Sequence, residues 1–356
     1  MSNNIPIKNI YYILSYVYQN LNQDCYKNIQ TENFDNATDM FAAILIKGIE
    51  QQVKRYLNRE YVQGKDSLSV LRGKIEIKDS INEMSFLKKR LICSYDEFSI
   101  DSYMNRILKS CMIVLIRSES VRHEYRQKIK GLLGYFSTVK EIDLHHINWK
   151  LQFNKNNQNY RLLMDICYLL IHSQLQSRNQ GNTKIMNFYD DQEDFMHNLY
   201  EKFIFAYYKK EYGKTLNVYY QKKIDWQLDD NFNEMLPNMY SDIILQTKDK
   251  SSTLIIDAKY YSHTTQVQYD KHSIHSGNLY QIFTYVKNTE ENFHKNYINI
   301  KNPKIAGMLL YAKTSDNQLK NNDYSMSGNK ISVRTLNMDC DFEEIKEQLN
   351  ILVQRM

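Results

Sequence analysis

Two short apolar segments in the second half of the chain each carry an aspartate. Residues 239–245 predict a strand with Asp242 near its start, and residues 254–259, Leu-Ile-Ile-Asp-Ala-Lys, predict a second strand. The polar turn 248–252 between them indicates an antiparallel hairpin. Because side chains two residues apart share a face of a strand, Asp257 and Lys259 should point the same way. Asp242 can reach that face from across the hairpin.

This arrangement is suited to metal-assisted hydrolysis. Two carboxylates that converge at the splayed end of a sheet form an oxygen-rich site of the kind that Mg²⁺ prefers. A lysine beside them can orient or deprotonate a water and offset the charge that develops on a phosphate. A purely structural Asp257–Lys259 ion pair would give the same pattern, and the hairpin alone does not decide between the two interpretations.

The acid-x-Lys tripeptide is not specific by itself, because the chain contains three of them. The tripeptide at 76–78 has no upstream strand that offers a second acid. The one at 344–346 lies in a predicted helix, where positions i and i+2 do not share a face. Asp257 follows a strong apolar run and has an acid at hairpin distance, and an aspartate there is costly to bury without a purpose.

Three further residues are candidates for the same site. Glu201 lies in a predicted amphipathic helix at 193–212 and could add a carboxylate to the metal, although a solvated glutamate is an equally good interpretation. Gln281 and Tyr285 are spaced i, i+4 and therefore share one face of the helix that follows the hairpin. They could hold a DNA phosphate or brace Lys259.

The spacing of the histidines after the hairpin does not predict a zinc site. His263, His272 and His275 match no compact zinc motif, and no cysteine accompanies them. His275 is instead a candidate for a contact with a DNA phosphate. The sequence contains no Gly-x-x-x-x-Gly-Lys phosphate loop, so we expect the chain to bind no nucleotide by itself.

The elements that must position these residues divide the chain in two. The first half is mostly helical, with a strand or ribbon at 69–77 around Arg72 and Gly73. The polar stretch 174–187 has little periodicity and marks a boundary. The second half alternates helix and strand, which predicts an α/β domain with a mixed sheet. We therefore expect a helix-rich domain at 1–185 and an α/β domain at 186–356.

The composition of the chain limits the classes of protein to which it can belong. A chain of 356 residues with 42% hydrophobic and 13% aromatic residues is long enough for two domains and too apolar to be disordered. Its apolar runs are far shorter than a membrane span requires. Five scattered cysteines without a CxxC pair, and an N-terminus unlike a signal peptide, favour a reducing cytoplasm. The net charge of +5 permits binding to nucleic acid without predicting it.

The ordered motifs carry a family resemblance. Pro237, Asp242, Asp257-Ala258-Lys259 and Gln281-x-x-x-Tyr285 resemble the core of PD-(D/E)xK nucleases, although Pro237 stands five residues ahead of the first acid. More narrowly, the chain resembles the McrC family, the nuclease subunits of McrBC-type modified-cytosine restriction systems. The landmarks of this likeness span nearly the whole chain and lie at residues 5–12, 72–75, 105–109, 257–261 and 278–281.

The resemblance implies a specific function. Asp242, Asp257 and Lys259 would be the catalytic residues and Mg²⁺ the cofactor, in a restriction-endonuclease-like domain that cleaves double-stranded, modified DNA. The N-terminal domain would dock on a McrB-like AAA+ GTPase hexamer and stimulate its nucleotide hydrolysis, with Arg72 and Lys74 on the ribbon. Two alternatives remain open at this point: a non-catalytic activator of a ring NTPase, and a standalone Mg²⁺-dependent nuclease.

Overall fold

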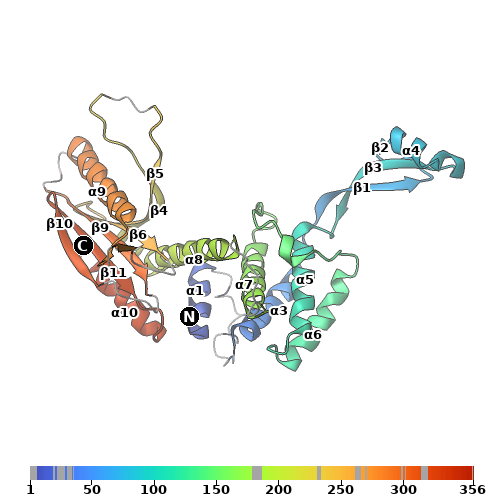
Figure 1. Ribbon diagram of the computed structural model, residues 1–356, viewed down its shortest axis with the longest axis horizontal. Coiled ribbons are helices and arrows are strands. Elements are labelled where there is room, and N and C mark those ends of the chain that lie inside the picture. The colour runs from blue at the N-terminus through green and yellow to red at the C-terminus, as the bar shows by residue number, and fades with distance from the viewer. Residues whose placement is uncertain are drawn as a thin grey trace. The chain divides into compact units, whose positions relative to one another are not determined.

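The chain forms two compact units in the computed structural model (Figure 1): Met1–Gln23 with Lys184–Met356, and Asp24–Thr183. The structure describes residues 6–18, 21, 29, 34, 36–178, 187–230, 234–260, 266–268, 271–297, 300, 302–313, 320–354 and 356. The break near residue 184 falls in the polar stretch that separates the predicted domains. The division into a docking domain and a nuclease domain stays a prediction.

The first unit is built on a six-stranded sheet with the order β10-β11-β9-β6-β5-β4. Its strands are β4 (Leu216–Ile224), β5 (Met239–Thr247), β6 (Ser252–Lys259), β9 (Lys304–Ala312), β10 (Asn322–Met326) and β11 (Asn329–Leu336). The central pairs β6–β9 and β9–β11 are parallel and the remaining pairs are antiparallel. The predicted mixed sheet in an α/β unit is confirmed. A separate small pair, β7 (Gln266–Gln268) and β8 (Lys271–Ser273), follows β6.

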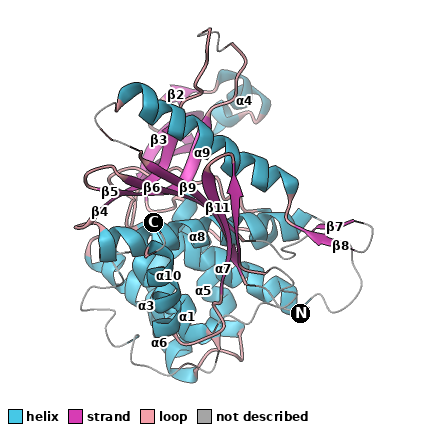
Figure 2. Ribbon diagram, turned by 90° about the vertical axis from the view of Figure 1, so that its left-hand side faces the viewer, coloured by secondary structure: helices cyan, strands magenta, loops and turns pink. Residues whose placement is uncertain are grey.

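Helices cover this sheet. Helix α9 (Ser276–Asn296) packs across β6, β9 and β11, as Figure 2 shows, and Ile255, Ile282 and Leu309 belong to the core between them. Added side-chain atoms at Gly307 would meet Ile282 and Val286 at 2.8 Å, so a glycine is needed for this close approach. Helix α8 (Asn187–Tyr212) packs on β4, β5 and β6, and α1 (Ile7–Val17) and α10 (Phe342–Val353) pack beside it.

The second unit joins a helical bundle to a ribbon. Its helices are α3 (Ala37–Lys54), α5 (Tyr103–Arg117), α6 (His123–Leu133) and α7 (Tyr160–Arg178). The ribbon consists of β1 (Glu60–Leu68) and β3 (Leu91–Ser99), paired antiparallel from Glu60↔Ser99 to Leu68↔Leu91, with β2 (Lys74–Ile75) on the other edge of β3. Helix α4 (Ile77–Asn82) and the 3₁₀ turn η3 (Ser85–Lys88) lie at its far end, as Figure 1 shows.

The ribbon differs from its sequence prediction. We expected a strand at 69–77, but strand structure in that range is limited to β2, and the long strands lie at 60–68 and 91–99. No side chain of β1 is fully buried, and the buried side chains of β3, Ile92 and Cys93, are consecutive, so neither strand shows the apolar alternation that marks a half-buried strand. Gly73 has φ +72, and added side-chain atoms there would meet the Ser94 carbonyl at 2.3 Å. The ribbon therefore requires glycine at that position.

None of the described helices combines the length and the apolar character needed to cross a bilayer.

Candidate active site

The β5–β6 hairpin splays apart where the two predicted acids lie. Its backbone pairing runs from Gln246↔Thr253 to Ile243↔Ile256 and ends there. Beyond that point the Ala258 N–H donates to Oδ2 of Asp242 at 2.8 Å, so a side chain takes the place of a backbone partner. Strand β6 itself continues beside β9, where Asp257 lies opposite Leu309. The predicted hairpin, with an acid from each strand at its open end, is confirmed.

Asp257 and Lys259 form a buried ion pair. Nζ of Lys259 lies 2.9 Å from Oδ2 of Asp257, and the two side chains are 10% and 1% exposed, respectively. Both carboxylate oxygens of Asp257 are fully buried, and the carboxylate interacts with the Lys259 ammonium and with the side chain of Asp242. A carboxylate offers about four acceptor positions on its two oxygens, so Asp257 retains capacity for a further partner.

Negative charge is concentrated around Asp242. Burial, together with the charges of Asp257 and Glu201, raises the pKa of Asp242 to about 8, against the opposing effects of Lys259 and the Ala258 N–H. Burial also raises the pKa of Asp257, although the Lys259 charge opposes it. Like charges that share a site disfavour ionisation, and a bound cation would reverse that preference.

Side chains of helix α9 hold Lys259 in place, which is one of the two roles that the sequence analysis offered for Gln281 and Tyr285. Nζ of Lys259 donates to Oε1 of Gln281 at 3.3 Å, and Nε2 of Gln281 donates to the Tyr285 hydroxyl at 2.9 Å. The two residues are one turn apart on the face of α9 that packs on the sheet. His275 immediately precedes α9, and its carbonyl accepts the N–H groups of Asn278 and Leu279. Its predicted phosphate contact stays a prediction.

Glu201 is buried rather than solvated. It lies on α8 with 4% of its surface exposed, and it accepts a hydrogen bond from Nε2 of Gln221 at 3.3 Å. Burial raises the pKa of the Tyr220 hydroxyl, and the charge of Glu201 and a hydrogen bond to it raise it further. His197, one helical turn before Glu201, lies close enough for its charge to lower the pKa of Asp257.

Glu201 was named in the sequence analysis, but His197 on α8 and Gln221 on β4 were missed. The i, i+4 spacing of His197 and Glu201 was a usable signal, because it places both on one face of the helix. Gln221 gave none. It is opposite Asp242 in the β4–β5 register, between the paired positions Tyr220↔Ile243 and Lys222↔Ser241, and its φ is +44. A left-handed non-glycine residue inside a strand is uncommon, and such strained positions cluster at functional sites.

The donor set fits Mg²⁺ better than a closed metal cage. Among the described residues, no group of three or more His, Cys, Asp or Glu side chains is arranged to hold a metal ion. Two neighbouring buried carboxylates, those of Asp242 and Asp257, are nevertheless present. Mg²⁺ usually keeps several waters and is bound through one or two carboxylates together with substrate phosphates. The histidines after the hairpin were predicted not to bind zinc. This stays a prediction, because the side chains of His263 and His272 lie outside the described residues.

Comparison with known proteins decides the family. A family model for the McrBC 5-methylcytosine restriction system component matches residues 7–298, which is more than half of the 356 residues. The chain belongs to this McrBC family. It is 26% identical to the type IV methyl-directed restriction enzyme EcoKMcrBC of Escherichia coli strain K12, over 97% of this chain and 96% of that protein.

Two solved structures of McrBC assemblies show weaker likeness. One is the refined half-complex from a tetradecameric assembly of Thermococcus gammatolerans McrB AAA+ hexamers with bound McrC, with TM-score 0.45, 16% identity and coverage of 98% of this chain and 76% of that chain. The other is the cryo-EM structure of the Thermococcus gammatolerans McrBC complex, with TM-score 0.36, 17% identity and coverage of 51% and 61%.

The predicted partner-stimulating residues of this McrBC family member lie on the ribbon of the second unit. The Arg72 guanidinium lies over the Tyr95 ring, 4.1 Å from its centroid, and 4.0 Å from the Glu97 carboxylate. Lys74 lies 3.8 Å from Glu76, and its side chain is 80% exposed. Both residues are accessible, and their role in stimulating a partner stays a prediction.

The raised pKa of Asp242 predicts that Asp242→Asn stabilises the metal-free protein at neutral pH. In the unfolded chain this carboxyl ionises near its ordinary pKa of about 3.9. In the folded chain it holds its proton up to about pH 8, so stability falls as pH rises between these values. Asparagine can still accept the Ala258 N–H. We expect the melting temperature of the variant to exceed that of the wild type by about 5 °C at pH 8 and to match it at pH 4.

Scanning calorimetry in EDTA at both pH values measures this effect. Asp339→Asn is the control, because Asp339 is exposed and has no comparable surroundings. Equal melting temperatures of Asp242→Asn and wild type at pH 8 would show that ionisation of Asp242 does not lower the stability of the folded protein, and would contradict the raised pKa.

Proposed function

We propose that this chain is the DNA-cleaving subunit of a modified-cytosine restriction complex, and that its first unit is a PD-(D/E)xK nuclease domain. The observation that carries the proposal is the buried Asp257 at the splayed end of the β5–β6 hairpin. Its oxygens are fully buried, Nζ of Lys259 lies 2.9 Å from one of them, and the side chain of Asp242 interacts with the same carboxylate. Membership of the McrBC family supports the substrate class.

In this proposal Asp242 and Asp257 would hold Mg²⁺, and Glu201 is the candidate for a third carboxylate. The ion would lower the pKa of a water and offset the charge on the scissile phosphate. Lys259 is fixed by Asp257 and Gln281, so its ammonium can stabilise the negative charge that develops on the phosphate without reorganising. Loss of the metal should therefore abolish cleavage without unfolding the site.

The second unit is proposed to dock on a McrB-like AAA+ GTPase hexamer. The far end of its ribbon exposes large apolar side chains, with 62% of Leu71, 67% of Ile77 and 70% of Leu87 accessible. Scattered exposed apolar residues are normal, but a concentration of them in about twenty residues marks an interaction surface. We call residues 70–87 the ribbon tip. Arg72 and Lys74 lie within it and would approach the partner's nucleotide.

The test is reconstitution with the purified full-length chain. Plasmids with and without 5-methylcytosine are incubated with the chain, in the presence or absence of the hexameric partner, GTP and Mg²⁺. We expect cleavage of the methylated plasmid only when all components are present. Cleavage by the chain and Mg²⁺ alone would establish the standalone nuclease instead. Stimulated GTP hydrolysis without any cleavage would establish the non-catalytic activator.

A further inference from the structure

The motif Asn105-Arg106-Ile107-Leu108-Lys109 lies where the ribbon joins the helical bundle, and the catalytic proposal gives it no role. The motif forms the first turns of α5, directly after the ribbon. The polypeptide enters the ribbon through residues 55–59 and leaves it through residues 100–102. Each connection is a short segment outside the helices and strands. Hinges form in such segments, because a few changes of φ and ψ there can reorient the whole element that follows.

The Asn105 side chain joins these two connections. Its Nδ2 donates to the carbonyl of Asn58 at 2.9 Å and to that of Ile100 at 2.8 Å. Its Oδ1 accepts from the Tyr160 hydroxyl at 2.9 Å, and that hydroxyl accepts the Asn58 N–H at 2.9 Å. Asn58, Tyr160 and Asn105 therefore close a ring of hydrogen bonds. Asn105 is fully buried, so each of these bonds is costly to break.

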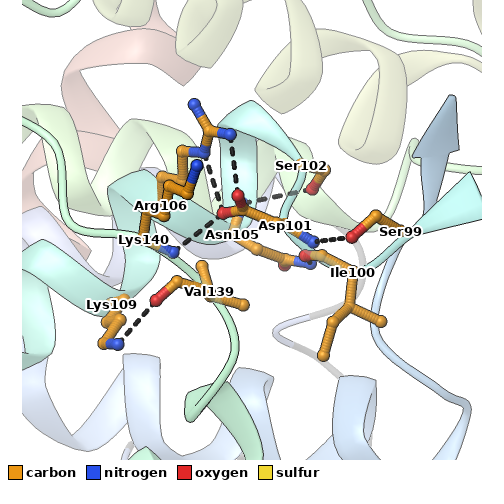
Figure 3. Close-up of polar contacts among 9 residues, drawn as sticks. All are labelled: Ser99, Ile100, Asp101, Ser102, Asn105, Arg106, Lys109, Val139 and Lys140. Carbon is orange, nitrogen blue, oxygen red and sulfur yellow. Dashed lines mark hydrogen bonds and ion pairs between the residues drawn. The ribbon is translucent and has the colours of Figure 1, made fainter. Parts of the chain in front are cut away.

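A second set of contacts fixes the outgoing connection, as Figure 3 shows. The Arg106 guanidinium binds both carboxylate oxygens of Asp101 at 2.8 Å, and the Lys140 N–H donates to the same carboxylate at 2.8 Å. Lys109 donates to the carbonyl of Val139 at 2.6 Å, which holds that segment against α5. Although partial burial opposes it, Arg106 and the Lys140 N–H hold the pKa of Asp101 below its ordinary value.

We propose that Asn105, with Tyr160 and the Arg106–Asp101 pair, is a rigid joint that fixes the direction of the ribbon relative to the helical bundle of the second unit. The joint works by cross-linking the two connections, so neither can rotate alone. The inference rests on the proposed docking role of the ribbon tip for its functional consequence. A ribbon held in one direction presents the tip to the partner in one orientation, whereas a hinged ribbon must be ordered at each encounter.

Distance measurements across the joint test the proposal in the full-length chain. Nitroxide labels are placed at Glu83 on the ribbon tip and Gln127 on α6, both exposed. Of the natural cysteines, Cys93, Cys111 and Cys167 are buried and can remain, while Cys25 and Cys340 are replaced by serine. Pulsed electron–electron double resonance then gives the distribution of label separations. Stimulation of GTP hydrolysis by the hexameric partner is titrated with each of the same proteins, which gives the half-saturating concentration of the chain.

The variants are Asn105→Ala and Tyr160→Phe, and the second keeps the test valid if the first does not fold. Tyr160→Phe removes one hydroxyl and leaves Asn58 N–H without its acceptor. Ser110→Ala is the matched control, because Ser110 is buried on the same helix and loses a 2.9 Å hydrogen bond from Ile142 that does not touch the ribbon. Melting temperatures of all three show whether they lose comparable stability.

We expect the two joint variants to widen the distance distribution by about two-fold and to raise the half-saturating concentration by about ten-fold, with Ser110→Ala unchanged in both. A distribution as narrow as that of the wild type in Tyr160→Phe would overturn the joint. A widened distribution with an unchanged half-saturating concentration would support the joint and overturn the docking role of the ribbon tip. The failures of the two proposals are therefore distinguishable.

Discussion

Asp257→Asn should abolish DNA cleavage while leaving the chain folded and able to stimulate its partner. Asparagine keeps the shape of the side chain but removes the charge that would hold a cation. We expect cleavage to fall at least about a thousand-fold, because several kcal/mol of transition-state stabilisation are lost and each 1.4 kcal/mol or so is a factor of ten. The measurement is the initial rate of plasmid cleavage by the reconstituted complex, with GTP hydrolysis followed in parallel.

Asp249→Asn is the matched control for this experiment. Asp249 lies in the turn of the same hairpin, is exposed, and interacts with neighbouring residues of that turn, Thr247 and Ser251. It should cleave at the wild-type rate. Wild-type cleavage by Asp257→Asn would mean that the Asp257–Lys259 pair is structural, and the catalytic assignment would be wrong.

The second large effect is expected at the ribbon tip. Leu71→Asp and Leu87→Asp place charges on side chains that are 62% and 70% exposed, so the fold of the isolated chain should tolerate them. If the partner buries these side chains, each substitution forfeits about 1.5–3 kcal/mol of apolar burial, which corresponds to a loss of affinity of roughly ten- to a hundred-fold. Titration of the chain against the hexamer, read out as GTP hydrolysis, measures the half-saturating concentration.

Tyr135→Asp serves as the comparison for the ribbon tip. Tyr135 is 57% exposed in the same unit but lies after α6, away from the ribbon. An unchanged half-saturating concentration for the ribbon-tip variants, or an equal loss for Tyr135→Asp, would remove the ribbon tip from the docking surface.

The β5–β6 hairpin could be predicted because the sequence signals that define it are local. Asp242, Asp257 and Lys259 sit in or directly after short apolar runs, and the two-residue period of a strand fixes which side chains share a face. The i, i+4 rule likewise placed Gln281 and Tyr285 together, and in the structure Lys259 donates to Gln281, which in turn donates to Tyr285. Neither inference needed knowledge of distant contacts.

The remaining features depend on packing that no short segment reveals. Glu201 could be solvated or buried on its sequence alone, and only the packing of α8 on the sheet decides it. Gln221 adopts a left-handed backbone where nothing in its sequence requires one. Most side chains of β1 and β3 are partly or fully exposed, and the two buried ones in β3 are consecutive, so their apolar residues do not alternate in a way that predicts these strands. Asn105 was visible as part of a motif, but its role follows from the two carbonyls that it binds.

The position of α1 has a consequence for the order in which the chain can fold during synthesis. Nδ2 of Asn9 donates to the carbonyl of Met338 at 3.0 Å, and the Tyr12 ring stacks on Phe342 with centroids 4.5 Å apart. These partners are translated more than three hundred residues after α1. The second unit has its own core and can fold first on the ribosome. The unit that carries Asp242 and Asp257 gains its full set of contacts only after residue 342 has emerged, so the nascent chain can present its ribbon before its acidic site is complete.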